Sequence, residues 1–463
     1  MSQRQAGSTN RPPKRQTRPL ALVNARIIDP ATNRDETGGV LVEDGIIRDL
    51  GPQITRTGLP EDAEVIDCNG DVLCPGLIDM RVQLREPGEE HQETIETGSL
   101  AAAAGGVTSM VTLPNTDPII DDVAGVEFIA RRARETKRAK IYCYGALTRG
   151  LEGKDLVEMG LLSASGALGF TDALHAVADA QVMRRALNYA KSFGLLVIQH
   201  PEEPRLAAGG AMNNGALATK LGLPGIPAAA EVMMIERDLH LVRMSGARYH
   251  VAHISTAAAV EAIRKAKQEG LPVTCDTAPP YFSLNEAEIG DYRTFAKLSP
   301  PLRDESDRRA IAAAVAEGII DCIASDHAPH DVESKRVPFA QAAAGGIGLE
   351  TLLPVSLGLT HNRSVSLSNL LKCLTSRPAE ILGLPQGRLA KGAPADMTLI
   401  DLEHQHKIDL TQFHSKSKNS PYDGRQVQGA VRRTFVDGRE VFAAAGANCW
   451  VSSSSLAFRW RTC

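Results

Sequence analysis

Polar side chains whose chemistry suits metal binding and substrate recognition follow short apolar runs along the chain. In chain order they are Arg81, Gln83, Arg85, Asn115, Asp172, His200, His253, Asp326, His327 and His330. Two neutral imidazoles and a carboxylate, with water in the fourth position, form a three-ligand catalytic zinc set. Isolated histidines are more often ordinary core or surface residues, but His200 and His253 both end apolar runs and precede breaks. We therefore expect these side chains to share one site.

The elements that must position these side chains repeat one rhythm of a short apolar run, a turn and a longer segment with helical spacing. The helical segments carry boundary signals, such as Asp179 and Gly194 at the two ends of one segment. This alternation predicts a parallel α/β fold, a (β/α)8 TIM barrel, although an open doubly wound sheet has the same local pattern. Catalytic groups of such barrels collect at the C-terminal mouth of the strands. The candidate strands are 73–80, 108–114, 141–147, 167–171, 195–200, 248–255, 272–277 and 321–327.

The regions outside the barrel differ in style. Residues 19–72 and 384–445 read as short strands with turns, and we expect them to pair into one small composite β domain that brackets a barrel over 73–383. Residues 1–18 are basic and polar and lack the apolar stretch of a secretion signal, which predicts a disordered tail. Residues 446–463 show neither periodicity nor a clear cap, and they receive no role.

Composition limits the classes of function. The chain has 463 residues, 43% of them hydrophobic and 23% charged, which predicts a globular protein with a large core. A net charge of −4 and a pI near 6.3 provide no basic surface for nucleic acid. The eight cysteines include no Cys-x-x-Cys pair, which favours reduced thiols, and no apolar run reaches the roughly 18 residues of a membrane span. We therefore expect a cytoplasmic protein without nucleic-acid or membrane partners.

Several motifs resemble those of a known family. They are PGLIDM with LREPG (75–88), AAAAGGVTSMVTLPNTDP (101–118), LGLPGIPAAAE (221–231), ARYHVAHIST (247–256), SPPLRDESDR (299–308), IDCIASDHAPH (320–330) and GLETLLP (348–354). From about Leu20 to Phe442 the chain resembles the bacterial class I dihydroorotases of the cyclic amidohydrolase superfamily. The resemblance implies a barrel enzyme for the reversible hydrolysis of dihydroorotate to N-carbamoyl-aspartate in pyrimidine biosynthesis.

The resemblance also implies a metal centre, which this chain keeps only in part. Family members hold two zinc ions with His-x-His after the first strand, a bridging acidic or carbamylated residue after the fourth, histidines after the fifth and sixth, and an aspartate after the eighth. His200, His253 and Asp326 match, and Asp326 also matches the catalytic proton shuttle. Arg81 and Gln83 replace His-x-His, and Ala173, next to Asp172, replaces the bridging residue. We expect at most one zinc ion per chain, held by the three matching residues.

The substrate-binding residues are better kept. Arg85 and Asn115 match the family residues that hold the substrate carboxylate, for which a guanidinium fork is geometrically suited. His330 matches a further substrate contact, whereas Ser299 stands where the family usually has asparagine. The expected small molecules are therefore dihydroorotate and carbamoyl aspartate.

Three alternatives remain beside a single-zinc enzyme. A metal-free enzyme could use the Arg81 cation to polarise a carbonyl and Asp326 as general base. A catalytically inactive member could act as a scaffold that associates with aspartate transcarbamoylase. Another cyclic amidase, such as a hydantoinase or allantoinase, is disfavoured by the REPG and PNTDP segments. The resemblance further favours a homodimer.

Overall fold

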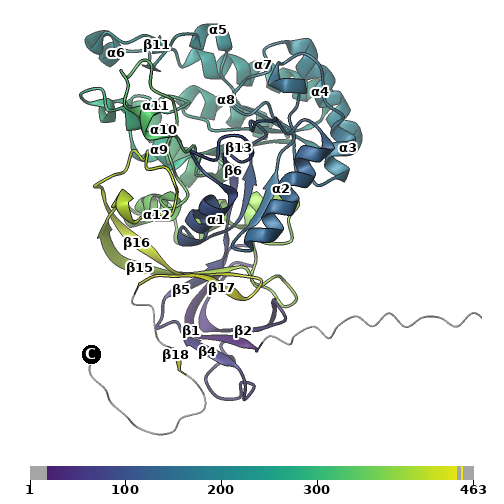
Figure 1. The fold of residues 1–463 in the computed structure, drawn as a ribbon, viewed down its shortest axis with the longest axis vertical. Coiled ribbons are helices and arrows are strands. Elements are labelled where there is room, and N and C mark those ends of the chain that lie inside the picture. The colour runs from purple at the N-terminus through teal and green to yellow at the C-terminus, as the bar shows by residue number, and fades with distance from the viewer. Residues whose placement is uncertain (1–17, 446–449, 452–463) are drawn as a thin grey trace, which may run out of the picture.

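The fold joins a barrel of short parallel strands, surrounded by helices, to a sheet that lies beneath it (Figure 1). The structure is a computed structural model that describes residues 18–445 and 450–451. Both ends of the described chain run into the sheet, while the middle of the chain forms the barrel. The predicted tails 1–18 and 446–463 lie outside the described residues, apart from Arg18 and the strand β18 (Trp450–Val451).

The barrel wall follows the order of the strands along the chain. Its strands are β6 (Leu77–Val82), β7 (Val107–Thr112), β8 (Lys140–Cys143), β9 (Leu196–Gln199), β12 (Arg248–Val251), β13 (Val273–Thr277) and β14 (Cys322–Ile323). They form two parallel ladders, β6–β7–β8 and β9–β12–β13–β14. Phe170 connects the ladders through bridges to Gly145 and Val197, and a bridge between Val82 and His327 closes the ring. The predicted (β/α)8 barrel is confirmed, with the fourth position reduced to the segment around Phe170.

Helices cover the outside of the barrel (Figure 1). The longer ones are α1 (Ile95–Ala104), α2 (Val123–Thr136), α4 (Ala180–Phe193), α7 (Ala229–Ser245), α8 (Ala257–Gln268), α10 (Glu305–Ala316), α12 (Leu352–His361), α13 (Leu367–Leu374) and α14 (Ser376–Leu382). As predicted, Asp179 caps α4 by accepting bonds from two amides of its first turn, and Gly194 ends it at φ 68°. Thr256 caps α8 in the same way.

Shorter elements lie in the connections. They are α3 (Met159–Ala164), α5 (Pro204–Ala207), α6 (Ala216–Leu221), α9 (Pro279–Ser283), α11 (Val332–Lys335), the strands β10 (Met212–Asn213) and β11 (Gly225–Ile226), and the 3-10 turns Arg149–Leu151, Glu286–Ile289, Thr294–Ala296 and Leu410–Gln412. Several of them follow the C-terminal ends of the barrel strands.

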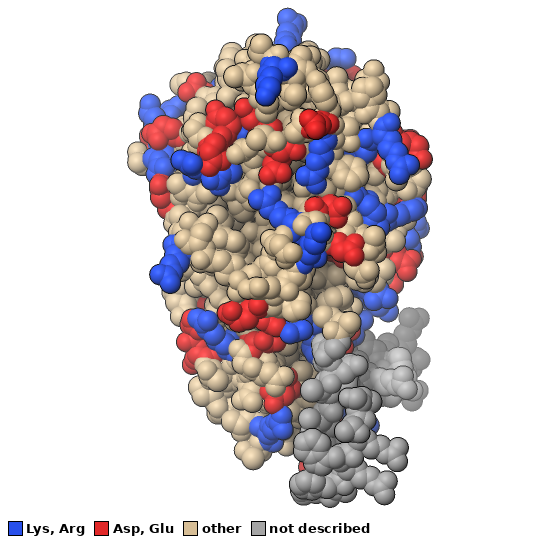
Figure 2. All heavy atoms as spheres, turned by 90° about the vertical axis from the view of Figure 1, so that its left-hand side faces the viewer, with Lys and Arg blue, Asp and Glu red and all other residues tan. Residues whose placement is uncertain are grey.

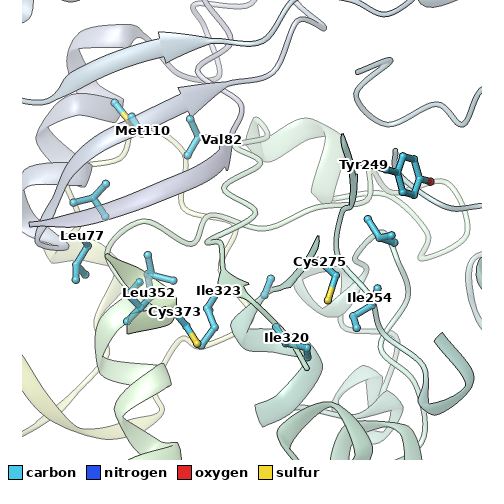
Figure 3. Close-up of a cluster of buried hydrophobic side chains, with 14 of the residues drawn as sticks. Leu77, Val82, Met110, Tyr249, Ile254, Cys275, Ile320, Ile323, Leu352 and Cys373 are labelled. Atoms are coloured by element: carbon cyan, nitrogen blue, oxygen red, sulfur yellow. The ribbon is translucent and has the colours of Figure 1, made fainter. Parts of the chain in front are cut away.

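The main hydrophobic core lies between the barrel wall and its helices. Figure 3 shows Leu77, Val82 and Met110 on one side, and Ile323, Leu352 and Cys373 near one another. The barrel strands read as continuous buried runs because both faces are covered, as β6 and β7 show. The described cysteines, Cys68, Cys74, Cys143, Cys275, Cys322 and Cys373, are all free and buried.

The sheet beneath the barrel is built from both flanks of the chain. Its strand order is β17-β16-β15-β5-β1-β2-β3, and β4 adds to β1 and pairs with β18. The bounds are β1 (Leu20–Asp29), β2 (Arg34–Glu43), β3 (Ile46–Gly51), β4 (Glu64–Asp67), β5 (Val72–Pro75), β15 (Met397–Lys407), β16 (Gln426–Val436) and β17 (Arg439–Ala443). The domain limits 19–72 plus 384–445 stay a prediction, except that the sheet extends to Pro75.

The predicted first barrel strand, 73–80, is in fact two strands. Residues of β5 pair with β1 and β15 in the sheet, and β6 begins only at Leu77 in the barrel. Gly76 lies between them, and a Cβ at this position would come within 2.2 Å of Thr108 side-chain atoms. The apolar pattern runs through both strands because both are buried, so periodicity alone does not reveal the break.

The surface carries both signs of charge. Figure 2 shows Lys and Arg side chains interspersed with Asp and Glu on one face, without a broad region of a single sign. Of the helices in the described part of the chain, none is long and apolar enough to cross a membrane.

Candidate active site

The Arg81 guanidinium lies at the C-terminal mouth of the barrel, among residues that follow three different strand positions. The residue is only 2% exposed. Its Nε is 3.4 Å from Asp326 Oδ1, and its Nη2 donates to the carbonyl of Ala173 at 3.3 Å. Its Nη1 is buried without a hydrogen-bond partner among the described residues. A permanent cation therefore sits beside the predicted catalytic carboxylate.

His253 is oriented by a buried carboxylate. The Asp276 Oδ1 atom accepts the His253 amide at 2.8 Å and lies 2.9 Å from His253 Nδ1, which places the proton of the neutral ring on Nδ1. The other oxygen, Oδ2, is 2.9 Å from His250 Nε2. His253 Nε2 lies 3.1 Å from Asp326 Oδ1, an ion-pair contact when the ring is protonated. These contacts form a chain that leads from His250 in the barrel interior, through Asp276 and His253, to Asp326 at the mouth.

The pKa values of this group follow from burial and charge. Burial and the Arg81 charge lower the pKa of His253, but the neighbouring carboxylates Asp326 and Asp276 outweigh them and raise it above its ordinary value. Burial alone would raise the pKa of Asp276, yet its two histidine partners hold it well below its usual range. Asp276 is therefore ionised at neutral pH, and it favours a proton on His253.

His200 has a different environment. Its Nε2 is 3.4 Å from Ser299 Oγ, and its Nδ1 has no hydrogen-bond partner among the described residues. Burial, followed by the charges of Arg81 and His253, lowers the pKa of His200 well below its ordinary value. The ring is therefore neutral, and an unused nitrogen remains on it.

The residues around Arg81 do not fit a zinc ion as they are arranged. The unpartnered His200 Nδ1 and His253 Nε2 atoms would suit one, but the two ring centroids are 6.3 Å apart. Rings that share a tetrahedral zinc at a Zn–N distance of about 2.0–2.1 Å have centroids about 5 Å apart. Asp326 contacts His253 directly, and the Arg81 cation occupies the space beside it. In residues 18–445 and 450–451, no three or more His, Cys, Asp or Glu side chains are grouped to hold a metal ion.

Of the predicted substrate-binding residues, Arg85 lies near His330, and Asn115 pairs with Gln83. Arg85 donates from Nε to the Pro329 carbonyl at 3.1 Å and from Nη1 to Glu89 at 2.8 Å, which places it beside the segment that carries His330. Asn115 donates from Nδ2 to Gln83 Oε1 at 3.1 Å. Gln83 therefore orients the Asn115 amide, a role that its position in the motif did not indicate.

His330 is neutral in this environment. Burial, with the charges of Arg85 and Lys335, lowers the pKa of His330 to about 4. Its Nε2 is 2.9 Å from the Ala344 carbonyl, so the proton of the neutral ring is on Nε2 and Nδ1 is an acceptor.

Strained backbone marks the same region. Four residues at the ends of barrel strands have left-handed φ values: Arg85 at 60°, Ala173 at 58°, His253 at 52° and Asp326 at 51°. Non-glycine residues adopt this conformation at a cost, and such residues collect at functional sites. At Ala173 the conformation accompanies a carbonyl that accepts from Arg81.

The structure brings some of the predicted residues together and leaves others apart. His253, Asp326 and Arg81 do lie together, whereas Asp172 does not reach them, because it accepts bonds from the amides of Leu147 and Thr148. The contact between His250 and Asp276 was missed. Both interrupt apolar strand runs, and a buried polar side chain must find a partner, which is the signal that could have paired them.

Comparisons with known proteins agree with this architecture. The family model Dihydro-orotase-like matches residues 70–259, and the model Amidohydrolase family matches residues 296–442. The chain is 48% identical to the dihydroorotase of Anaplasma phagocytophilum, over 92% of this chain and 95% of that protein. It is 46% identical to the dihydroorotase of Geotalea daltonii, over 91% and 99%.

Solved structures show the same fold. The L-hydantoinase of Arthrobacter aurescens superimposes with a TM-score of 0.80 at 25% identity, covering 91% of this chain and 95% of that one. The dihydropyrimidinase of Brevibacillus agri superimposes with a TM-score of 0.78 at 24% identity, covering 95% and 100%, and shows the fold alone. Given relatives of such identity over nearly the whole chain, this protein belongs to the dihydroorotase family of cyclic amidohydrolases.

Proposed function

We propose that the protein hydrolyses the ring amide of dihydroorotate, reversibly, to N-carbamoyl-aspartate, and that it serves pyrimidine biosynthesis. The observation that carries this proposal is the Asp326 carboxylate at the barrel mouth, 3.1 Å from His253 Nε2 and 3.4 Å from Arg81 Nε. Its side chain is 13% exposed, against 3% for Arg81 and none for His253, so it is the most exposed member of the group. The names of the relatives support the same reaction.

The proposed roles follow from the chemistry of each side chain. Asp326 takes a proton from the attacking water and returns it to the leaving ring nitrogen. Arg85 and Asn115 hold the substrate carboxylate, and His330 makes a further contact from its neutral ring. The amidohydrolase family is generally metal-dependent. A single zinc ion held by His200, His253 and Asp326 remains a prediction. Because these residues are not arranged to hold the ion in this structure, no step of the reaction is assigned to it.

The test is turnover of dihydroorotate, hydantoin and allantoin, measured side by side on purified, tag-free protein. We expect dihydroorotate alone to be turned over efficiently, because hydantoin and allantoin lack the carboxylate that Arg85 and Asn115 are proposed to bind. Preference for hydantoin or allantoin would contradict the proposed substrate.

Three further parts of the proposal concern the cell. We place the protein in the cytoplasm as a homodimer, with aspartate transcarbamoylase as a candidate partner. Size measurement of the protein alone and with that enzyme tests the last two. If no ring is hydrolysed even with aspartate transcarbamoylase present, the enzyme role fails and a scaffold remains.

A further inference from the structure

The buried guanidinium of Arg81 is not fully used by the fold. A guanidinium carries five N–H donors, and here Nε faces Asp326, Nη2 donates to Ala173, and Nη1 has no partner in the described part of the chain. A buried donor without a partner destabilises the folded state, because its hydrogen bond to water has been lost and not replaced. The fold maintains this cost at the mouth of the barrel, next to the most exposed carboxylate of the group. One hydrogen-bond donor of Arg81 is therefore left unused beside the mouth.

A second buried arginine in the same chain shows the contrast. All three nitrogens of Arg303 are engaged: Nε donates to Ser255 at 3.1 Å, Nη1 donates to the Ile226 carbonyl at 3.0 Å, and Nη2 is 3.8 Å from Glu231. Arg303 therefore serves packing and loop order. Arg81, by contrast, has one nitrogen without a hydrogen-bond partner among the described residues, which is the arrangement of a binding group.

We propose that Arg81 is a catalytic residue that supplies the positive charge at the reacting carbonyl, so that hydrolysis needs no resident metal ion. The inference rests on the proposed function and deepens it. It follows from the misfit described above, since the Arg81 cation lies beside the carboxylate that a metal would need, and His253 already contacts that carboxylate. Preorganised donors in a water-poor site stabilise developing negative charge strongly.

The reaction balances without a further reactant. The oxygen of water bonds to the ring carbonyl carbon, one of its protons passes to Asp326, and the carbonyl electron pair becomes an oxyanion that Arg81 Nη1 binds. The oxyanion then reforms the C=O bond, the bond from carbon to the ring nitrogen breaks, and Asp326 returns the proton to that nitrogen. The ring opens to a single product, which carries a new carboxylic acid, which ionises, and a ureide.

The first experiment combines metal analysis with kinetics on the purified full chain. We expect less than stoichiometric zinc and turnover of dihydroorotate that survives chelation. Arg81→Met keeps the length of the side chain and removes the charge, and kcat should fall on the order of 10²–10³-fold with a smaller change in KM. In Arg81→Ala, added guanidinium chloride at non-denaturing concentration should restore part of kcat, an effect that a purely structural role would not produce. Arg309→Met, at an exposed arginine, is the control and should leave turnover unchanged.

A second readout does not depend on activity. The variant Arg81→His with Gln83→His places two imidazoles at the C-terminal end of β6 and removes the cation, and we expect it to bind zinc that the parent protein does not. Gln83→His alone keeps Arg81 and should not. These metal contents are measured on folded protein by elemental analysis.

The outcomes separate the two proposals. Turnover that is lost on chelation and restored by zinc, or Arg81→Met with unchanged kcat, would overturn the role of Arg81 and leave the proposed function standing. Absence of turnover in the parent protein with every ring tested would overturn the proposed function itself.

Discussion

The hydrogen bonds of Asp276 determine which nitrogen of His253 faces Asp326. Because Asp276 is ionised, accepts from the backbone amide of His253 and lies 2.9 Å from Nδ1, the ring cannot turn over without losing its Nδ1 bond. The ring therefore presents Nε2 to the mouth at 3.1 Å from the carboxylate. Asp276 is a positioning residue, since it acts through His253.

Asp276→Asn tests this role. An asparagine amide can donate to Nδ1 and favour the other tautomer, so we expect kcat to fall by about 10²-fold or more while KM changes little, as for other oriented histidines. The control is Asp172→Asn, because Asp172 is also a buried carboxylate at a strand end but serves only the Leu147–Thr148 turn. That variant should lower the melting temperature and keep kcat per folded molecule. Equal loss of kcat in both variants would contradict a specific role for Asp276.

Residues at the ends of strands could be predicted from the sequence, whereas polar residues inside strands could not. His253 and Asp326 could be predicted because a run ends at each of them and their motifs match a family. His250 and Asp276 could not, since each lies within an apolar run and their partnership across β12 and β13 exists only after the sheet has formed. The misfit of the predicted zinc ligands likewise depends on the distance between the His200 and His253 rings. Spacing along the chain does not determine that distance.

Among the elements, the short strand β6 determines where Arg81 and Gln83 point. It continues β5 through Gly76, so the same segment leaves the sheet and enters the barrel. The strand pattern was predicted but its interruption was not, because β5 and β6 are both fully buried and read as one apolar run. The backbone can pass from β5 to β6 only because Gly76 has no side chain, since a Cβ there would clash with Thr108.

Gly76→Ala should therefore destabilise the protein. The new Cβ would lie within 2.2 Å of Thr108 side-chain atoms, and overpacking of this kind costs about 1–3 kcal/mol. Adding Thr108→Gly removes the atoms that clash. The double variant should therefore recover part of the unfolding free energy that Gly76→Ala loses relative to the parent. Denaturant unfolding of the two single variants and the double variant gives the coupling. Strictly additive effects would show that the contact with Thr108 is not the cause.

For the whole molecule, stability combines a large core with buried charges that the fold tolerates. Lys335, 3% exposed, is the clearest case: its Nζ donates to the carbonyls of Ala343 at 2.6 Å and Thr294 at 3.3 Å, and no carboxylate of the described residues pairs with it. These bonds tie α11 to neighbouring connections that follow the barrel strands. Burial, together with the charge of Lys297, lowers the pKa of Lys335 to about 7.

This shift predicts how the unfolding free energy of the whole molecule changes with pH. Between about pH 7 and pH 10 the unfolded chain keeps the Lys335 proton, since its pKa there is about 10.4, while the folded chain has lost it. The unfolded state then binds more protons, so stability from this group rises with pH, by at most about 4 kcal/mol and by less where the carbonyls hold the ammonium. Lys335→Met removes the group, and urea unfolding from pH 6.5 to 9.5 should give a flatter profile than the parent, with the largest gain in stability at the acid end. Lys154→Met, at an exposed lysine, should follow the parent profile. A profile for Lys335→Met that runs parallel to the parent would show that this lysine stays protonated in the folded molecule.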